Sequence, residues 1–538
     1  MAVPISGGVG FMRYLRSSAA VAVAAAAVVI ASTSAGAATT PAYKIANVGA
    51  YGGEPSIVSD SLGQLYDTTP SGGTITYTST NKGNSWTKVT TADSISGDDC
   101  LATDQANSVY LCNLAGSEGV APLQADVWKS VDHGKNWTHG AGAIPQCATS
   151  CSPFGVDRDW VAASIPTGGT TAKAEVVLMY HDFYGPSQIW VNISNDGGAT
   201  FGRPQEVLAS PAVTPGAITG TLVAEGYTFC NTVPAGVSIA PPGTPHAGRI
   251  TVAWIAADLA QNASGCNVSM LQSFHTVWVS YSDDNGTTWT PQQVWDAGIG
   301  HDTSTPFVAY TIDKQGNPYF GLAVNASSNP ATCSAESTAG TVQSDPSCEY
   351  DMYVVWSNNG GATWDGGGGL IPGSAASAYR VNPASETGTH FFPAIAAGDP
   401  GKVDVAYLRT NEILPTDTFG KADPGGCAGP GPANGNPTTF PPICSWNLYA
   451  AQSLNLTAGT SGATWAVTQI TTTPMHVGDI CNLGIFCLAP SSNRNLLDFI
   501  METLDPSGCA HIAYADDNTV NKLRAANQTA GACLIAKH

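Results

Sequence analysis

An eight-residue stretch, SDDNGTTW at residues 282–289, decides the fold because close copies of it recur along the chain. The copies share the pattern Ser-x-Asp/Asn-x-Gly-x-Thr-Trp, with small variations at the last two positions. The other four clear copies are STNKGNSW (79–86), SVDHGKNW (130–137), SNDGGATF (194–201) and SNNGGATW (357–364). A sixth, degenerate copy ends at Thr464-Trp465. A motif that returns in this way indicates a fold built from repeated units.

Each copy of this octapeptide is predicted to form the turn of a β-hairpin. Alternating apolar residues precede it, as in residues 277–281 (VWVSY), and a short β-like stretch follows. The Asp or Asn side chain can accept hydrogen bonds from backbone N–H groups of the turn, and Gly supplies the positive φ that the turn needs. The aromatic residue then packs beneath the turn. These residues are therefore predicted to stabilise the fold and not to act in catalysis.

A second repeated unit, two short apolar strands joined by a Gly- or Pro-containing turn, precedes the octapeptides. Its seven copies lie at 54–69, 98–113, within 159–183, within 219–257, and at 305–323, 391–409 and 499–516. One strand before each octapeptide and one after it complete four-stranded units. The sequence thus predicts an all-β fold, a β-propeller with seven four-stranded blades.

Two questions about this propeller stay open at the sequence level. The fourth strand of the last blade can come from residues 43–48 or from residues 533–536. Six blades are the alternative if the weakly patterned unit at 219–257 is an insertion. Separate β-sandwiches would require linkers between self-contained parts, and no such linker is evident.

The N-terminal segment predicts export from the cytoplasm. Arg13 and Arg16 precede an apolar run at 19–31, and the small-residue pattern Ala35-Gly36-Ala37 follows. This is typical of a secretory signal peptide, assigned to residues 1–38, with a single propeller domain at 39–538. The apolar run is too short to span a bilayer, so no membrane insertion is expected and the protein is predicted to be secreted.

Fourteen cysteines in an exported chain favour disulfide bonds over metal sites. Pairing of sequence neighbours is the simplest hypothesis, although spacing alone does not fix connectivity. The expected pairs are Cys100–Cys112, Cys147–Cys151, Cys230–Cys266, Cys333–Cys348, Cys427–Cys444, Cys481–Cys487 and Cys509–Cys533.

The formal charge of −20 excludes some classes of partner. An acidic protein repels phosphate backbones, so nucleic acid is not expected as a partner. An extracellular glycan or glycoconjugate fits this charge. No cofactor is predicted and no metal ligands are assigned, because no cation loop with defined ligand spacing is present; clustered carboxylates leave Ca²⁺ open.

The topology of a propeller brings the starts of all inner strands to one rim of the central channel. Polar residues just before these strands, or just after each second strand, therefore converge there. The predicted catalytic candidates are Asp98, Asp157, Asp159, His181 and Asp182. The predicted substrate-binding residues are Glu54, Arg158, His301, Asp302, Glu386, His390, Arg409 and Arg494. Paired carboxylates on this rim would suit glycoside hydrolysis.

The octapeptides resemble the Asp-box, or BNR, repeats of the sialidase superfamily, and the resemblance extends over about residues 50 to 520. Residues 52–57 (GGEPSI), 157–162 (DRDWVA), 179–183 (MYHDF) and 391–407 look like those of secreted bacterial sialidase-like proteins. The resemblance implies a propeller and activity on glycans. True sialidases use three arginines, a tyrosine nucleophile, a glutamate and an aspartate, with an Arg-Ile-Pro motif. This sequence has no Arg-Ile-Pro, so no nucleophile is transferred.

Two functional hypotheses follow. The first is a secreted glycoside hydrolase in which carboxylates of the channel rim share the acid and base roles. The second is a non-catalytic propeller that binds glycan or protein on the same face. Fold alone does not choose between them.

Overall fold

The computed structural model describes residues 40–49, 52–70, 74–89, 96–115, 124–140, 156–182, 189–207, 222–224, 227–258, 274–297, 303, 307–325, 349–365, 378–410, 445–478, 480, 495–519 and 522–536. All of them belong to one compact unit, residues 39–538. Residues 1–38, the predicted signal peptide, form a separate unit and lie outside the described residues.

The first three blades are four-stranded antiparallel sheets. Blade 1 contains β2 (Ser56–Ser59), β3 (Leu65–Pro70), β4 (Thr74–Ser79) and β5 (Thr87–Lys88). Blade 2 contains β6 (Ser96–Thr103), β7 (Val109–Ala115), β8 (Gln124–Ser130) and β9 (Thr138–His139). Blade 3 contains β10 (Val156–Ser164), β11 (Glu175–Asp182), β12 (Ile189–Ser194) and β13 (Gln205–Glu206), with a short 3-10 turn at Thr171–Lys173.

The remaining blades follow the same plan, and two of them carry an extra short strand. Blade 4 contains β14 (Leu222–Ala224), β15 (Tyr227–Ile239), β16 (Ile250–Asp258), β17 (Thr276–Ser282) and β18 (Thr290–Asp296). Blade 5 contains β19 (Ala309–Ile312), β20 (Pro318–Asn325), β21 (Tyr350–Trp356) and β22 (Tyr379–Arg380). Blade 6 contains β23 (His390–Ala397), β24 (Val403–Arg409), β25 (Ser445–Ser453), β26 (Ala466–Gln469) and β27 (His476–Val477), with a 3-10 turn at Leu456–Ala458. Blade 7 contains β28 (Met501–Leu504), β29 (Ala510–Asp516), β30 (Lys522–Ala530) and β1 (Ala42–Asn47).

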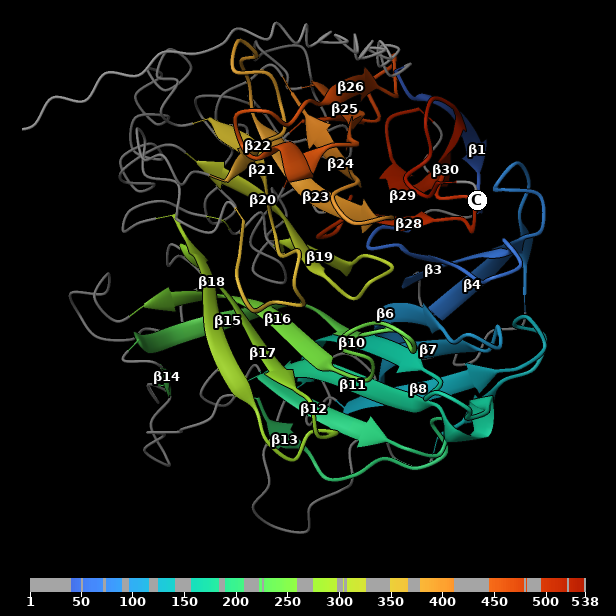
Figure 1. The fold of residues 1–538 in the computed structure, drawn as a ribbon. Coiled ribbons are helices and arrows are strands. Elements are labelled where there is room, and N and C mark those ends of the chain that lie inside the picture. The colour runs from blue at the N-terminus through green and yellow to red at the C-terminus, as the bar shows by residue number, and fades with distance from the viewer. Residues whose placement is uncertain are drawn as a thin grey trace, which may run out of the picture. The chain divides into compact units, whose positions relative to one another are not determined.

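The seven sheets form a closed ring (Figure 1). Their inner strands β2, β6, β10, β15, β19, β23 and β28 contact one another in that order, and β28 contacts β2. The prediction of a seven-bladed β-propeller is confirmed. The six-bladed alternative is wrong, because residues 227–258 form the two inner strands of blade 4 and not an insertion.

Blade 4 differs from its sequence-based prediction at the inner strand. The apolar run at 219–226 was expected to be that strand, but the inner strand is β15, and β14 pairs only with its first residues, Leu222 opposite Phe229. The strand β15 is 13 residues long and has two register shifts along β16. A bulged strand of this length can pair with both β14 and β16.

The N-terminal strand closes the ring. Strand β1 pairs with β30 as the outermost strand of blade 7, where Ile45 lies opposite Ala526. This settles the open choice in favour of residues 43–48. The third and fourth strands of blade 7, β30 and β1, are therefore not joined by the hairpin turn that the octapeptide forms in other blades.

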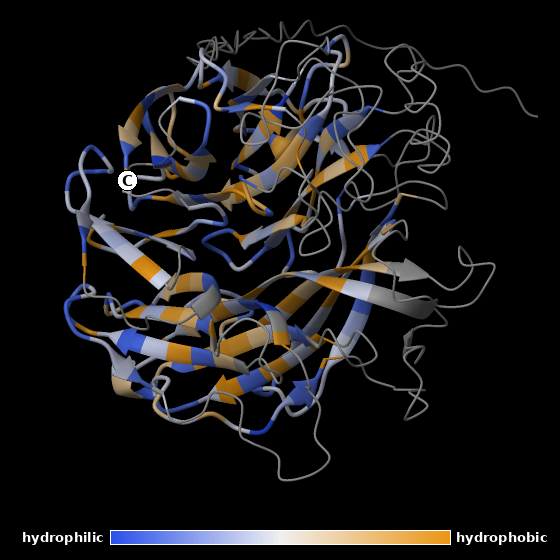
Figure 2. Ribbon diagram, turned by 180° about the vertical axis from the view of Figure 1, so that it is seen from behind, coloured by the Kyte–Doolittle hydropathy of each residue, from blue (hydrophilic) through white to orange (hydrophobic). Residues whose placement is uncertain are grey.

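The core lies between the blades, and central strands such as β20, β21 and β29 are buried at every position, because both faces of a blade pack against its neighbours (Figure 2). Its largest fully buried side chains are aromatic, among them Trp254, Trp278, Trp356 and Tyr407. Trp254 and Trp278 stack across β16 and β17 with ring centroids 6.4 Å apart. Because burying one large apolar side chain stabilises a fold by about 1.5–3 kcal/mol, these layers hold neighbouring blades together.

The octapeptides form the predicted turns between third and fourth strands. Ser282 Oγ donates to Asp284 Oδ1 over 2.8 Å, and the Gly286 N–H donates to Ser282 Oγ over 2.8 Å. The Thr288 N–H donates to Asp284 Oδ1 over 2.8 Å, and Gly286 has a φ of +78°. The degenerate sixth copy keeps the bond from the Thr464 N–H to Asn455 Oδ1, over 3.0 Å, and a longer one from Ser453 Oγ to Asn455 Oδ1, over 3.3 Å.

A second set of Asp turns joins the first and second strands, and the sequence reasoning missed it. Asp60 Oδ1 accepts hydrogen bonds from the N–H groups of Leu62 and Gln64, and the Tyr66 hydroxyl donates to its Oδ2 over 3.2 Å. The same Asp and Tyr spacing recurs at 104–110 and 313–319. An aspartate followed six residues later by a tyrosine is the sequence signal that could have revealed these turns.

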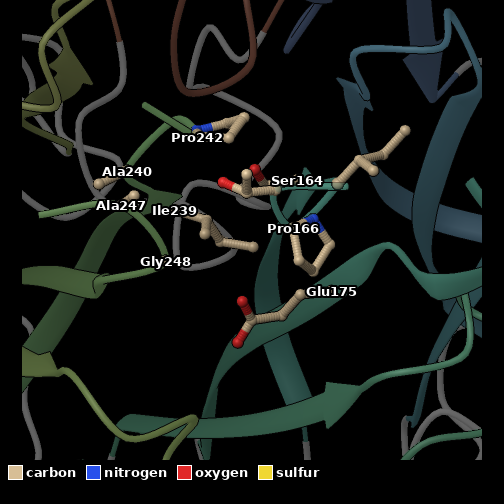
Figure 3. A pocket seen from close by; sticks show the side chains of 10 residues that line it. Ser164, Pro166, Glu175, Ile239, Ala240, Pro242, Ala247 and Gly248 are labelled. Carbon is tan, nitrogen blue, oxygen red and sulfur yellow. The ribbon is translucent and has the colours of Figure 1, made fainter. Parts of the chain in front are cut away.

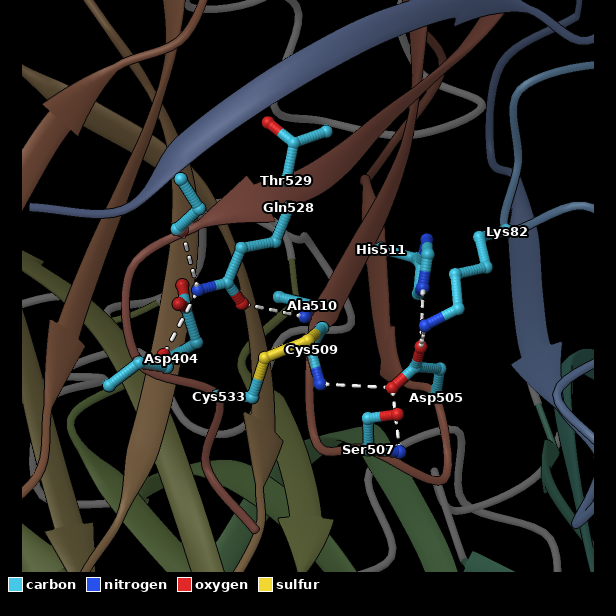
Figure 4. The surroundings of a disulfide bond; sticks show 12 residues. Lys82, Asp404, Asp505, Ser507, Cys509, Ala510, His511, Gln528, Thr529 and Cys533 are labelled. Carbon is cyan, nitrogen blue, oxygen red and sulfur yellow. Dashed lines mark hydrogen bonds and ion pairs between the residues drawn. A yellow bond between two sulfur atoms is a disulfide. The ribbon is translucent and has the colours of Figure 1, made fainter. Parts of the chain in front are cut away.

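Two of the predicted disulfides are confirmed. Cys100–Cys112 joins β6 to β7, and Cys509–Cys533 ties the C-terminal residues to blade 7 (Figure 4). Near the second bond, the Asp399 N–H donates to the carbonyl of Leu534. The C-terminal residues thus pack on turns of blades 6 and 7. The other five predicted pairs lie outside the residues whose side chains are described.

Candidate functional site at the channel rim

The chain enters four inner strands through a left-handed backbone residue. Glu54, Arg158, Phe392 and Leu497 have φ values of 47°, 53°, 53° and 55°. In blade 3 the register shifts between Asp157 and Asp159, so Arg158 is the extra residue of a β-bulge. Bulges redirect side chains, and strained non-glycine residues concentrate at functional sites. The rim where the inner strands begin is therefore the place to look for a site.

Arg158 is the centre of this rim and meets acidic residues of blades 1 and 2. Its Nη1 lies 3.8 Å from Glu54 Oε2 and 3.6 Å from Asp98 Oδ2. Its Nη2 donates to the carbonyl of Asp99 over 3.5 Å. The side chains of Arg158 and Glu54 are each 4 % exposed, whereas that of Asp98 is 22 % exposed. Asp98 is thus the carboxylate of this group that solvent reaches.

Aromatic rings cover the faces of the same guanidinium. Its central carbon lies 4.4 Å from the ring of Trp160, 4.2 Å from that of Phe499 and 5.9 Å from that of Phe307. Phe307 precedes the inner strand of blade 5, and Phe499 precedes that of blade 7. Residues from blades 1, 2, 3, 5 and 7 can surround one side chain only near the propeller axis, where the inner strands of all blades converge. We call Glu54, Asp98, Arg158, Trp160, Phe307 and Phe499 the axial cluster.

Two buried carboxyl groups lie behind the axial cluster. Burial raises the pKa of Asp99 well above its ordinary value; Arg158 opposes the rise, and Asp98 and Asp159 add to it. Burial, with the nearby charge of Asp99, also raises the pKa of Asp67. The Thr68 hydroxyl donates to Asp99 Oδ2 over 3.1 Å. This arrangement favours the protonated form and can hold a proton beside the cluster.

The other predicted residues of blade 3 lie at the same rim. Asp157 is paired opposite His181 and Val156 opposite Asp182, but the side chains of Asp157 and Asp182 lie outside the description. Asp159 is fully buried. Burial lowers the pKa of His181 to about 4, so its ring is neutral at pH 7. His301, Asp302 and Arg494 lie outside the described residues.

Glu386, His390 and Arg409 come together in a second group, where blade 6 meets blade 5. Arg409 Nη1 lies 3.1 Å from Glu386 Oε1, and His390 Nε2 lies 3.4 Å from Glu386 Oε2. Arg409 also donates to the Tyr449 hydroxyl over 3.1 Å. Burial alone would raise the pKa of Glu386, but His390 and Arg409 bring it below the ordinary value. These mutual contacts are typical of a structural ion-pair network that stabilises the rim loops.

Sequence reasoning had not included Phe307, Phe499 and Asp67 among the site residues. Phe307 and Phe499 look like ordinary core residues, and their only signal is a position just before an inner strand. Asp67 lies inside strand β3, which is buried at every position except its last. A charged residue within such a strand is the signal that could have been used.

Within the described part of the chain, no group of three or more His, Cys, Asp or Glu side chains is arranged to hold a metal ion. No helix in that part is long and apolar enough to cross a membrane.

Comparison with known proteins shows no family for this chain. No protein-family model matches the sequence, and no curated protein matches it. A polysaccharide lyase, an ulvan lyase of family PL25, has 11 % identity and a TM-score of 0.46 over 90 % of this chain and 95 % of its own. The α-L-arabinanase of Penicillium chrysogenum has 11 % identity and a TM-score of 0.38 over 69 % and 94 %. The sialidase of Trypanosoma rangeli has 11 % identity and a TM-score of 0.36 over 90 % and 59 %. The structures that resemble this chain thus include a sialidase and other enzymes named for action on glycans.

Proposed function

We propose that the chain is a secreted glycoside hydrolase that acts on extracellular glycans at the axial cluster. The observation that carries this proposal is that one nitrogen of Arg158 reaches two carboxylates from different blades, Glu54 and Asp98. In this proposal Asp98, the more exposed of the two, contacts the glycosidic bond, and Glu54 is its partner.

The separation of the two carboxylates fits this chemistry. The two oxygens lie 3.8 and 3.6 Å from the same nitrogen, so they are at most about 7.4 Å apart. Glycosidases place their two carboxyl groups roughly 5 to 9.5 Å apart, one acting as acid and the other as base or nucleophile. The aromatic neighbours of Arg158 exclude water and thereby strengthen the electrostatic interactions within the axial cluster.

Several features of the whole chain support an extracellular site of action. The predicted signal peptide and the two disulfides agree with export. The octapeptide turns have the hydrogen bonds expected if they are the Asp-boxes that they resemble. The net charge of −20 favours a neutral glycan over an anionic one. No cofactor enters the proposal, and assays with and without EDTA would test for Ca²⁺.

Hydrolysis of a panel of chromogenic glycosides, sialosides included, tests the proposal. Asp98→Asn is expected to lower kcat by at least about 100-fold, because acid–base groups contribute on that order. Glu54→Gln should have a comparable effect. Asp283→Asn is the matched control, since Asp283 also pairs with an arginine, Arg249, but lies on the opposite face with a side chain that is 56 % exposed.

The outcomes separate the two hypotheses. Hydrolysis by Asp98→Asn at the wild-type rate would show that Asp98 is not a catalytic carboxylate. Full activity in Asp283→Asn would show that hydrolysis is not lost merely because an arginine-paired aspartate has been neutralised.

A non-catalytic propeller that binds glycan or protein is the second candidate. The near-complete burial of Glu54 favours it, because a carboxylate that is 4 % exposed must become accessible before it can act as nucleophile or base. Retention on a glycan array without hydrolysis of any bound glycan would support this candidate and contradict the first.

A further inference from the structure

A cavity lies between blades 3 and 4 on the face opposite the channel rim. It occupies about 110 Å³ and is lined by the ends of β10 and β15 and the start of β11. The lining residues include Ile165, Pro166, Ile239 and Pro242. Exposed residues at its mouth, Thr167 and Ala247 among them, connect it to solvent. The lining is thus largely apolar, and its size suits a few non-hydrogen atoms.

One carboxylic acid, that of Glu175, belongs to this lining. Glu175 begins β11 opposite Ser164, the last residue of β10, and both line the cavity (Figure 3). Glu175 is 9 % exposed, and its Oε1 has no hydrogen-bond partner among the described residues. Ser164 is already engaged, because its hydroxyl accepts a hydrogen bond from Gln105 Nε2 over 3.2 Å.

Among the residues that the structure describes, no charged group offsets the burial of this carboxyl. Burial alone raises the pKa of Glu175 to about 7, with no contribution from a neighbouring cation. A buried carboxylate without partners is costly, and a cation that donates hydrogen bonds would remove that cost. Apolar walls around a single acid also suit the methylene groups of a small amine.

We propose that this cavity, which we call the Glu175 pocket, binds a small primary ammonium group that carries a short apolar chain. The ammonium would donate to Glu175 Oε1, and its chain would contact Ile239 and Pro242. The Glu175 pocket is independent of the proposed hydrolase site, because it lies at the other ends of the inner strands.

Calorimetric titration of the full chain with n-propylammonium at pH 8 tests this assignment. We expect saturable binding that weakens at least tenfold in Glu175→Gln, while n-propanol, which lacks the charge, binds at least tenfold more weakly than the amine. Lowering the pH to 5.5 protonates Glu175 and should weaken amine binding by about tenfold or more. Asp283→Asn, which neutralises another carboxylate on the same face, should bind like the wild type.

A second variant distinguishes a specific loss of binding from misfolding. Ala247→Trp places a large side chain at the exposed mouth, leaves Glu175 in place and should also abolish binding. Both variants should keep the wild-type melting temperature, or exceed it for Glu175→Gln at pH 8, where an unpartnered charge is removed. Absence of saturable heat with the wild type, equal binding of amine and alcohol, or binding within twofold of wild type in Glu175→Gln would each overturn the proposal.

Discussion

The aspartates of the octapeptide turns and the buried carboxyl groups beside the axial cluster shift their pKa values in opposite directions. On the turn face, a hydrogen bond from Asn136 leads the contacts that lower the pKa of Asp132 to about 2, and contacts from Thr288 likewise lower that of Asp284. At the axial rim, burial raises the pKa values of Asp99 and Asp67. The same residue type thus stabilises turns where it is solvated and can store protons where it is buried. Burial decides which, because Glu175 is buried on the same face as the turns and its pKa is raised as well.

The largest expected effect comes from breaking the axial cluster. Arg158→Met leaves Glu54 and Asp98 close together without their cation, so we expect the free energy of unfolding to fall by about 3–5 kcal/mol. Urea denaturation followed by tryptophan fluorescence measures it. A loss below about 1 kcal/mol would mean that the cluster is not electrostatically coupled.

A second effect concerns the buried acid pair where blades 6 and 7 meet. Asp404, hydrogen-bonded by Tyr43 and Gln452, lies beside Glu502, and burial raises both pKa values. Raised pKa values mean that stability is present at acidic pH and is lost as pH rises through the folded-state pKa.

Glu502→Gln should remove this loss of stability at alkaline pH. We expect the variant to match the wild type at pH 5 and to exceed it by about 1–3 kcal/mol at pH 9, measured by urea unfolding at both pH values. A variant that is less stable than the wild type at pH 9 would contradict the raised pKa of this pair.

A smaller effect is expected on the turn face. Ser282 is buried, and its hydroxyl both donates to Asp284 and accepts the Gly286 N–H. Ser282→Ala should therefore cost about 1–2 kcal/mol in chemical denaturation. The matched variant is Ser453→Ala in the degenerate copy, where Ser453 Oγ donates to Asn455 Oδ1 over 3.3 Å, compared with 2.8 Å for the bond from Ser282 to Asp284. It should cost less. Equal costs would show that bond geometry does not set the contribution of these turns.

The smallest effect should come from an exposed ion pair on the same face. Lys82, whose side chain is 64 % exposed, lies 3.2 Å from Asp505 of blade 7 (Figure 4). Lys82→Met should change the unfolding free energy by less than about 1 kcal/mol, and the change should shrink further in 0.5 M salt. A larger, salt-independent loss would mean that this pair holds blades 1 and 7 together.

Sequence reasoning succeeded where structure is local. The octapeptides, the two confirmed disulfides and six of the seven hairpins follow from residues that are close together in the chain, whereas the first strand of the blade 4 hairpin was misplaced. The rim was also predicted from topology, and the structure brings Glu54, Asp98 and Arg158 together there and Glu386, His390 and Arg409 in a separate group. What spacing could not indicate is which rim residues meet, because residues far apart in sequence contact one another only after the ring has closed.

The sequence by itself determined the all-β repeat, its turns and the sorting of carboxylates into turn and rim sets, since hairpin patterns and turn chemistry depend on a few adjacent residues. The tertiary structure alone decided that β1 closes blade 7, that Phe307 and Phe499 cover Arg158 and that Glu175 lacks a cation. Those outcomes depend on burial and on distances between blades, and both are properties of the packed ring.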